Sequence, residues 1–222
     1  VRIALTLAAL NDLEVKTADI KNAYLTAPVT ERIWTILGPE FGQDSGKKAL
    51  VVRALYGLKS AGASFRAFMA EKLDDMGFKS SMGDPDVWMR PAAKPDGEEY
   101  YEYILVYVDD IISVSHKASE VMTEIQGTFK FKNDDVKKPD TYLGARLQEK
   151  SINGRKCWTM TSVDYINAAV KNVKEALTKK RWNLPSKVTT PMSISYAPEL
   201  DSTPELNVED VQYYQELIGM LR

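Results

Sequence analysis

Short stretches in which apolar and polar residues alternate dominate the first half of the chain and predict β-strands. Residues 13–19 alternate in this way, and shorter apolar runs occupy 33–37 and 50–55. Farther along, the stretches 141–148 and 156–161 are separated by an Asn-Gly pair, a dipeptide that favours a tight hairpin turn. These patterns predict three separate strands and one β-hairpin.

The strongest strand signal lies at 100–115. Two apolar runs in this stretch, Tyr103–Val108 and Ile111–Val114, flank the adjacent residues Asp109 and Asp110. A two-residue polar interruption between two apolar runs predicts another β-hairpin. Both aspartates are therefore expected at the turn of that hairpin.

Apolar residues at helical spacing predict helices between these strands. Residues 1–10 are apolar on nearly every side, which is typical of a buried helix and suggests a piece of a longer chain. The stretches 65–76, 118–129 and 163–177 each carry one apolar stripe, and a last helix is expected near Val208. Because hairpins and helices are interspersed without steady β-α-β alternation, the predicted fold class is α+β, a mainly antiparallel sheet with helices on one face.

Composition narrows the class of protein. The 222 residues fit one domain with a small second one, and 44% hydrophobic with 27% charged residues is typical of a globular protein. No apolar run approaches the roughly 18 residues of a membrane span, and no signal peptide is visible. The single cysteine, Cys157, and the single histidine, His116, cannot form an intrachain disulfide or anchor a zinc site. Both are interpreted as structural or surface residues.

Charge is distributed unevenly along the chain. Residues 1–129 hold 14 Lys and Arg against 19 Asp and Glu, residues 130–190 hold 14 against 6, and residues 191–222 hold 1 against 6. A basic block between two acidic ones suggests a surface that meets a polyanion. The alternative is a helix whose basic side chains are simply solvated, and the charge pattern alone does not separate the two.

The paired aspartates are the residues that most directly suggest chemistry. Oxygen ligands suit Mg²⁺, which usually takes one or two protein carboxylates together with substrate phosphates. The alternative is an ordinary exposed turn, which aspartate favours. Asp19 also ends a predicted strand, so adjacent antiparallel strands would bring it beside Asp109 and Asp110. Converging carboxylates of this kind are what two-metal phosphoryl transfer requires.

Six motifs follow one another along the chain: Asp19-Ile-Lys-Asn-Ala-Tyr24-Leu25, Leu55-Tyr-Gly-Leu-Lys-Ser60, Gly83-Asp-Pro-Asp86, Tyr107-Val-Asp-Asp-Ile111, Thr141-Tyr-Leu-Gly-Ala-Arg-Leu147 and Thr190-Pro-Met192. This ordered set resembles the reverse transcriptases of copia-type long-terminal-repeat retrotransposons. The resemblance covers essentially the whole chain. It implies an RNA- and DNA-directed DNA polymerase from a Pol polyprotein, with a right-hand architecture of palm, fingers and thumb.

The resemblance implies a domain layout and a catalytic centre. The palm would occupy 1–140 with partial fingers at about 26–62, the primer-grip hairpin and a small helical thumb 141–190, and a linker and the start of the connection and RNase H region 191–222. Asp19, Asp109 and Asp110 match the catalytic aspartates. The first two would hold two Mg²⁺ ions, for which Mn²⁺ can substitute, and Asp110 would contact metal less directly.

The same resemblance implies which residues meet substrates. The expected nucleotide-binding residues are Ile20, Tyr24, Tyr56, Gly57 and Lys59. Tyr24 matches the steric gate that excludes the ribonucleotide 2′-hydroxyl, although it could be a core tyrosine, and Lys59 could be a solvated lysine. The expected nucleic-acid contacts are Tyr107, Tyr142, Gly144, Arg146, Lys171 and Lys174. Strand residues packing the thumb base are an equally good interpretation of the 142–147 segment, and Trp182 is interpreted as core or interface.

The implied partners are an RNA or DNA template with its primer, dNTPs, and the fingers and RNase H segments of the same polyprotein, in an intracellular setting without a membrane. The chain departs from the family at Ser60-Ala61-Gly62, where a Gln-Ala-Pro-like run is usual. Two rival interpretations are an inactive nucleic-acid-binding remnant of a retroelement and a metal-dependent nuclease or cyclase on a similar sheet.

Overall fold

A computed structural model of the chain describes residues 1–181, 183, 187, 197–200, 202 and 204–221. Trp182 and the Thr190–Met192 motif lie outside the described residues. The chain divides into two compact units, which are described one at a time. The first comprises Val1–Leu143 and Leu147–Met160, and the second comprises Gly144–Arg146 and Thr161–Arg222.

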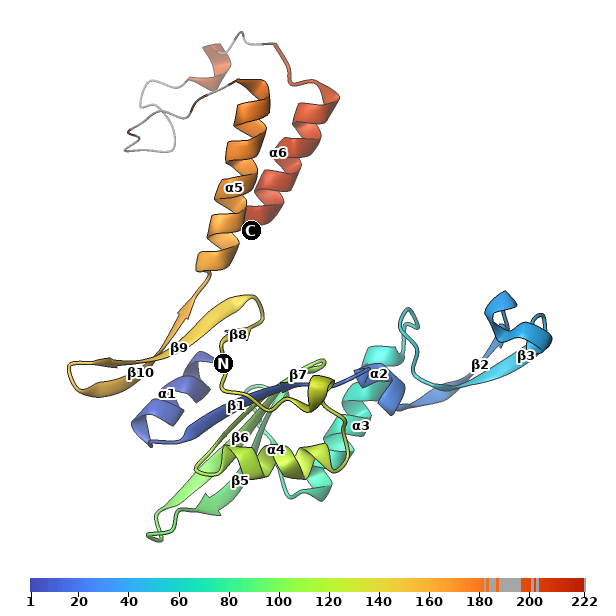
Figure 1. Cartoon of the computed structure of the whole chain (residues 1–222), viewed down its shortest axis with the longest axis vertical. Coiled ribbons are helices and arrows are strands. Elements are labelled where there is room, and N and C mark those ends of the chain that lie inside the picture. Colours follow the sequence, from blue (N-terminus) through green and yellow to red (C-terminus); the bar gives the residue numbers. More distant parts are fainter. Residues whose placement is uncertain (182, 184–186, 188–196, 201, 203, 222) are drawn as a thin grey trace. The chain divides into compact units, whose positions relative to one another are not determined.

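A five-stranded antiparallel sheet forms the centre of the first unit (Figure 1). Its strand order is β1-β7-β6-β5-β4. The strands are β1 (Glu14–Asp19), β4 (Lys79–Ser80), β5 (Val87–Ala93), β6 (Glu99–Tyr107) and β7 (Asp110–Ser115). The β6–β7 hairpin confirms the strongest strand prediction, and β1 pairs with β7 along its whole length. Strands β4 and β5 have no counterpart in the sequence-based prediction.

Helices cover both faces of this sheet, so the prediction of helices on one face was wrong. Alternate strand residues point to opposite faces, and Ile111 packs with the cluster that includes α3 (Ala61–Asp75) and α4 (Ala118–Gln126). The next residue, Ile112, packs with α1 (Arg2–Leu10) on the other face. Helix α1 is also not buried on every side.

Helix α1 buries only one side, although its sequence predicted a helix buried all round. Ala4, Leu5 and Ala8 are buried against the sheet, whereas Ile3 and Leu10 are 78% and 77% exposed. An apolar residue can remain in water on a helix that needs only one buried stripe. The prediction counted apolar residues around the whole helix, but the structure buries one stripe of it.

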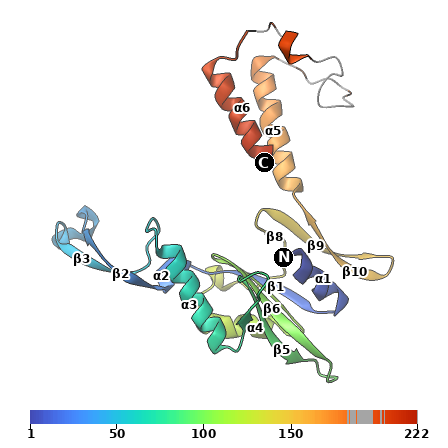
Figure 2. The same ribbon diagram turned by 180° about the vertical axis from the view of Figure 1, so that it is seen from behind.

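Two smaller sheets complete the strands. Strands β2 (Pro28–Ile36) and β3 (Lys48–Arg53) form a hairpin that extends away from the five-stranded sheet beyond the short helix α2 (Ala23–Thr26) (Figures 1 and 2). The second small sheet has the order β10-β9-β8. Its strands are β8 (Thr141–Tyr142), β9 (Ala145–Ile152) and β10 (Arg155–Thr161). The hairpin predicted around the Asn-Gly pair is confirmed.

Short 3₁₀ turns connect several elements. They are η1 (Pro39–Asp44), η2 (Lys132–Asp134) and η3 (Pro198–Leu200). Within η2, Asn133 and Asp134 have φ of 58° and 50°, a left-handed conformation that Asn and Asp tolerate better than most residues. This turn lets the chain bulge away from β1 between two points of contact, Ile20 with Phe131 and Thr17 with Lys137.

The second unit is built around two antiparallel helices, α5 (Val163–Lys180) and α6 (Val208–Leu221). Tyr165 donates a hydrogen bond to the Met220 carbonyl at 2.7 Å, and Tyr213 donates to Asn172 at 3.0 Å. Lys180 and Asp210 form an ion pair farther along. Because partners early in α5 lie late in α6, the two helices run in opposite directions. The helix predicted near Val208 is confirmed.

An ion network around the buried carboxylate of Glu102 ties β5 to its neighbours in the first unit. The Arg90 guanidinium lies 2.6 Å from Glu102 on β6 and 2.9 Å from Glu124 on α4. It also donates to the Met76 carbonyl at the end of α3, at 2.5 Å, and lies over the Phe78 ring at 4.2 Å from its centroid. The Arg90 side chain therefore connects β5 with β6, with the helices α3 and α4, and with Phe78 in the loop that follows α3.

Candidate functional site

Three aspartates lie together where β1 and β7 meet. Asp19 is the last residue of β1 and Asp110 the first residue of β7, and the antiparallel register places them directly opposite each other. Asp109 precedes Asp110 in the turn, and its carbonyl accepts a hydrogen bond from the Ile20 amide at 2.7 Å. The structure thus brings together residues that lie 90 positions apart in the sequence, as antiparallel pairing predicted.

The turn between β6 and β7 is tight. Val108 has a φ of 54°, which is unusual for a β-branched residue and costs conformational energy. Tyr107, just before it, pairs with Asp110 across the hairpin and is 58% exposed. The strained turn places Asp109 in the turn itself and Asp110 at the first position of β7, so the expectation that both aspartates lie in the turn holds for Asp109 alone.

The carboxylates disturb one another electrostatically. Burial raises the pKa of Asp110 above its ordinary value, and the negative charges of Asp109 and Asp19 raise it further, while Lys132 acts in the opposite direction. A cation placed among these carboxylates would relieve this repulsion, since opposite charges favour the ionised carboxylate. The donor set, carboxylate oxygens alone, suits Mg²⁺ or Mn²⁺.

On the side of Asp19 that faces away from Asp110, the neighbouring charged residue is a lysine and not another acid. The Lys132 ammonium nitrogen is 3.5 Å from Asp19 Oδ2. Within the described parts of the chain, no three His, Cys, Asp or Glu side chains are arranged as a complete metal site. Reasoning from the sequence missed Lys132, and the Asp109–Asp110 and Asp19 motifs carry no signal that could have identified it.

Tyr24 lies in an aromatic cluster near the turn between β6 and β7. Its ring centroid is 4.7 Å from that of Tyr56 and 6.0 Å from that of Phe65, the latter edge-on. Tyr24 and Phe65 also line a cavity of about 170 Å³. Gly62, Trp88, Tyr107 and Val108 are among the other residues that line it. Tyr24 is half-buried, so its ring has both a packed side and an accessible one.

The other candidate nucleotide-binding residues differ in accessibility. Tyr56 is 61% exposed and Lys59 is exposed. Gly57 has a φ of 95°, a conformation that favours glycine at this turn. Ile20 as a whole residue is 1% exposed, so it lies in the core and presents almost no surface to a nucleotide.

The candidate nucleic-acid contacts fall in both units. In the first unit, Tyr142 is 3% exposed, and its burial together with the charge of Asp110 raises its pKa. In the second unit, Gly144 has a φ of 75°, and Arg146 forms a bidentate ion pair with Asp164 at 2.7 and 3.0 Å. This pairing agrees with the alternative in which the segment supports the base of α5. Lys171 and Lys174 are exposed on α5.

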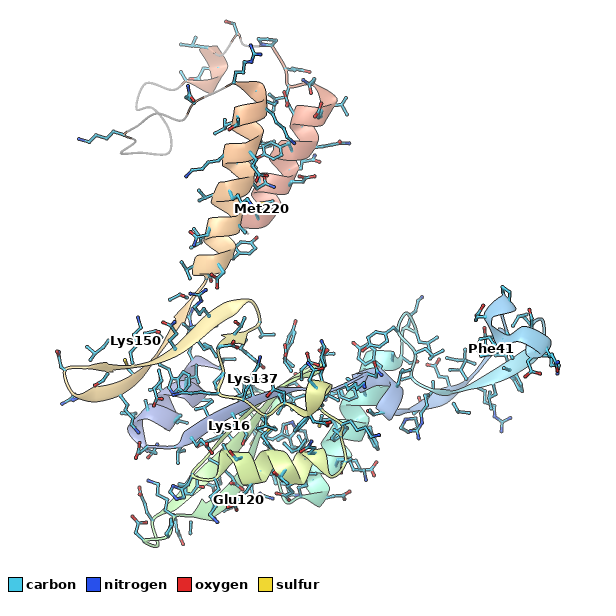
Figure 3. The ribbon with its side chains drawn as sticks, viewed as in Figure 1. Lys16, Phe41, Glu120, Lys137, Lys150 and Met220 are labelled. Atoms are coloured by element: carbon cyan, nitrogen blue, oxygen red, sulfur yellow. The ribbon has the colours of Figure 1, made fainter. Side chains whose placement is uncertain are left out.

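Part of the basic block is paired with acidic residues. Lys137 (labelled in Figure 3) lies 3.8 Å from Asp140, and Lys171 lies 3.8 Å from Glu175. Lys138 pairs with Glu149 as well.

No helix in the described residues is long and apolar enough to cross a membrane.

Comparison with known proteins assigns the chain to a class. The sequence profile of the family described as "Reverse transcriptase (RNA-dependent DNA polymerase)" matches residues 1–192. The chain therefore belongs to the reverse transcriptase family, and the resemblance to its copia-type members is confirmed.

Three curated relatives are similar to this chain in sequence, and all three are transposon Pol polyproteins. The Retrovirus-related Pol polyprotein from transposon TNT 1-94 of Nicotiana tabacum is 28% identical over 183 residues, which are 79% of this chain and 13% of the relative. The Pol polyproteins from transposons RE1 and RE2 of Arabidopsis thaliana are 30% and 29% identical over 114 and 115 residues, half of this chain. The matches span 7% and 8% of those two relatives. The chain thus corresponds to a small part of each polyprotein.

Proposed function

We propose that the chain is an RNA- and DNA-directed DNA polymerase domain that adds dNTPs to the 3′ end of a primer. The observation that carries this proposal is the direct cross-strand pairing of Asp19 with Asp110, next to Asp109 in the turn. Together with membership of the reverse transcriptase family, this cluster supports nucleotidyl transfer in preference to a purely structural acidic turn.

Asp19 and Asp109 would hold two Mg²⁺ ions, and Asp110 would support them from the first position of β7. When bound, such ions activate the attacking primer hydroxyl and neutralise charge on the triphosphate. By holding these ions at the end of the hairpin, the carboxylates would fix where the primer 3′-hydroxyl and the triphosphate lie relative to each other. The strands beneath them would keep this arrangement fixed, because β1 ends and β7 begins at the site with their backbones paired.

Tyr24 would select the sugar of the incoming nucleotide. Its ring is braced by Tyr56 and Phe65, and a braced ring would clash with a ribose 2′-hydroxyl. Lys59 is accessible enough to contact the triphosphate or template, and the Gly57 turn would let the backbone approach the nucleotide.

The remaining parts of the chain would serve as the other parts of a right hand. The five-stranded sheet with α1, α3 and α4 is the proposed palm, β2 and β3 are partial fingers, and α5 is the proposed thumb. Lys171 and Lys174 on α5 would contact phosphates of the primer–template without reading its sequence. The chain's further partners would be the fingers and RNase H segments of the same polyprotein, as the resemblance to copia-type reverse transcriptases implies.

Primer extension tests this proposal. A 5′-labelled primer on an RNA template with dNTPs and Mg²⁺ should lengthen with the wild-type chain and remain unchanged with Asp109→Asn. Asp12→Asn is the matched control, because Asp12 pairs with Lys156 at the opposite end of β1 from Asp19. Tight binding without extension would instead support an inactive remnant, and a shortened primer would support a nuclease.

A further inference from the structure

Asp19 has charged neighbours of opposite sign on its two sides. On one side, β7 places Asp110 directly opposite it. On the other side, the segment that follows α4 runs antiparallel to the end of β1, with Ile20 bridged to Phe131 and the Lys21 amide donating to the Lys130 carbonyl at 2.8 Å. In antiparallel pairing, the residue before Ile20 lies beside the residue after Phe131, so Lys132 is placed next to Asp19.

Backbone hydrogen bonds hold the segment that contains Lys132 beside β1. Thr17 and Lys137 exchange two hydrogen bonds of 2.8 and 3.0 Å, which anchor the other end of the segment to β1. The intervening bulge contains η2, with Lys132 as its first residue. The Lys132 ammonium therefore lies near the Asp19 carboxylate in the absence of substrate.

The ammonium lies beside the acidic cluster. It is 3.5 Å from Asp19 Oδ2, and Asp19 lies directly opposite Asp110. The Lys132 side chain is 63% exposed, and lysine carries its charge on a flexible four-carbon stem. The ammonium can thus leave the carboxylate and move into solvent while the backbone stays in place.

We propose that Lys132 is a built-in competitor of the divalent cation at Asp19. It partly neutralises the acidic cluster before a cation binds and must give up Asp19 to the cation. Lys132 is a positioning residue in this account, because it acts through the Asp19 carboxylate. The inference rests on the proposed function, which assigns Asp19 to the metal site.

Metal binding measured without any reaction tests the proposal. The probe is Mn²⁺, titrated into the full 222-residue chain without nucleic acid and followed by electron paramagnetic resonance. Lys132→Met should bind Mn²⁺ more tightly than wild type, by up to about five-fold, the most that an exposed ion pair is typically worth. Lys132→Arg, which keeps the charge, should restore the wild-type affinity.

Lys137→Met is the matched control. It removes a lysine from the same segment, but that ammonium is paired with Asp140 at 3.8 Å, so the Mn²⁺ affinity should not change. A Lys132→Met affinity equal to or weaker than wild type would overturn the proposal. Tightening of the same size in Lys137→Met would also overturn it, because a general change of charge would then explain the effect.

A second measurement needs no variant and covers the case in which Lys132→Met fails to fold. In the wild-type chain, Mg²⁺ should shift the side-chain NMR signal of Lys132 and leave that of Lys137 in place, and an unmoved Lys132 signal contradicts the proposal. Asp19→Asn separates the two levels of the argument. If Asp19→Asn leaves Mn²⁺ binding intact, the proposed metal site itself is wrong, whereas loss of binding there with no effect of Lys132 refutes this inference alone.

Discussion

Arg90→Met is expected to destabilise the first unit strongly, because it leaves a buried acid without its cation. Glu102 is 6% exposed and lies 2.6 Å from the Arg90 guanidinium. Its other carboxylate oxygen accepts a hydrogen bond from Ser115 at 2.8 Å, which does not neutralise the charge. Methionine keeps much of the length of arginine, so the substitution removes chiefly the charge and the hydrogen bonds.

The expected magnitude follows from burial. Breaking a buried pair by removing one partner costs about 3–5 kcal/mol, since the remaining charge is left uncompensated. The half-exposed Arg66–Asp86 pair, at 2.9 Å against 2.6 Å for Arg90–Glu102, provides the control, because Arg66→Met removes an ion pair of similar length that is worth at most about 1 kcal/mol. The contrast between the two variants therefore compares the loss of a cation beside a buried carboxylate with its loss beside a half-exposed one.

Urea unfolding followed by circular dichroism measures both free energies of unfolding. A double-mutant cycle with Glu102→Gln should show the double variant to be less destabilised than the sum of the single ones, with a coupling of about 1–3 kcal/mol. A loss in Arg90→Met no greater than that in Arg66→Met, or strictly additive single effects, would refute the reasoning that the network depends on charge compensation in the buried site.

Three further predictions concern the proposed site. Tyr24→Val should raise ribonucleotide incorporation relative to dNTP incorporation in steady-state assays, and Phe65→Leu should do so to a smaller extent. Phe68→Leu should not, because Phe68 packs on Phe129 and not on Tyr24. Unchanged sugar discrimination in Tyr24→Val would count against Tyr24 as the steric gate. Burial raises the pKa of Asp110 above its ordinary value of 3.8. The metal-free fold should therefore lose stability as the pH rises from 3.8 through the raised pKa, because the buried carboxylate becomes charged. Asp110→Asn should remove this loss in thermal melting curves recorded across that pH range, and an equal pH dependence of the melting temperature in both proteins would contradict the electrostatic argument. Primer–template affinity should fall steeply with salt, and Lys174→Gln should reduce the slope of log affinity against log salt by about one if Lys174 contacts a phosphate; an unaltered slope removes Lys174 from the interface.

Patterns of local periodicity predicted much of the fold and the central pair of the site. The alternation in 13–19 and the two runs around Asp109 gave β1, β6 and β7, and antiparallel pairing then predicted that Asp19 would meet Asp110. These predictions succeeded because strands buried on a sheet leave a regular apolar pattern in the sequence.

Strand β5 and Lys132 left no such pattern. Arg90 and Pro91 interrupt the apolar run in β5, yet Arg90 is accommodated by Glu102 on the neighbouring strand. Pro91 is tolerated because β4 pairs only with Met89 and Trp88, so the strand has an unpaired edge at the proline. Lys132 reaches Asp19 across 113 positions of sequence, a contact that only the tertiary fold creates.

Template-directed addition of a single nucleotide tests the central claim most directly. The four dNTPs are offered one at a time on an RNA template with Mg²⁺, and the primer is resolved at single-nucleotide resolution. The account predicts that the wild-type chain and Asp12→Asn add only the complementary nucleotide, and that Asp109→Asn adds none. Addition that ignores the template, addition by Asp109→Asn at the wild-type rate, or no addition by the wild-type chain would contradict it.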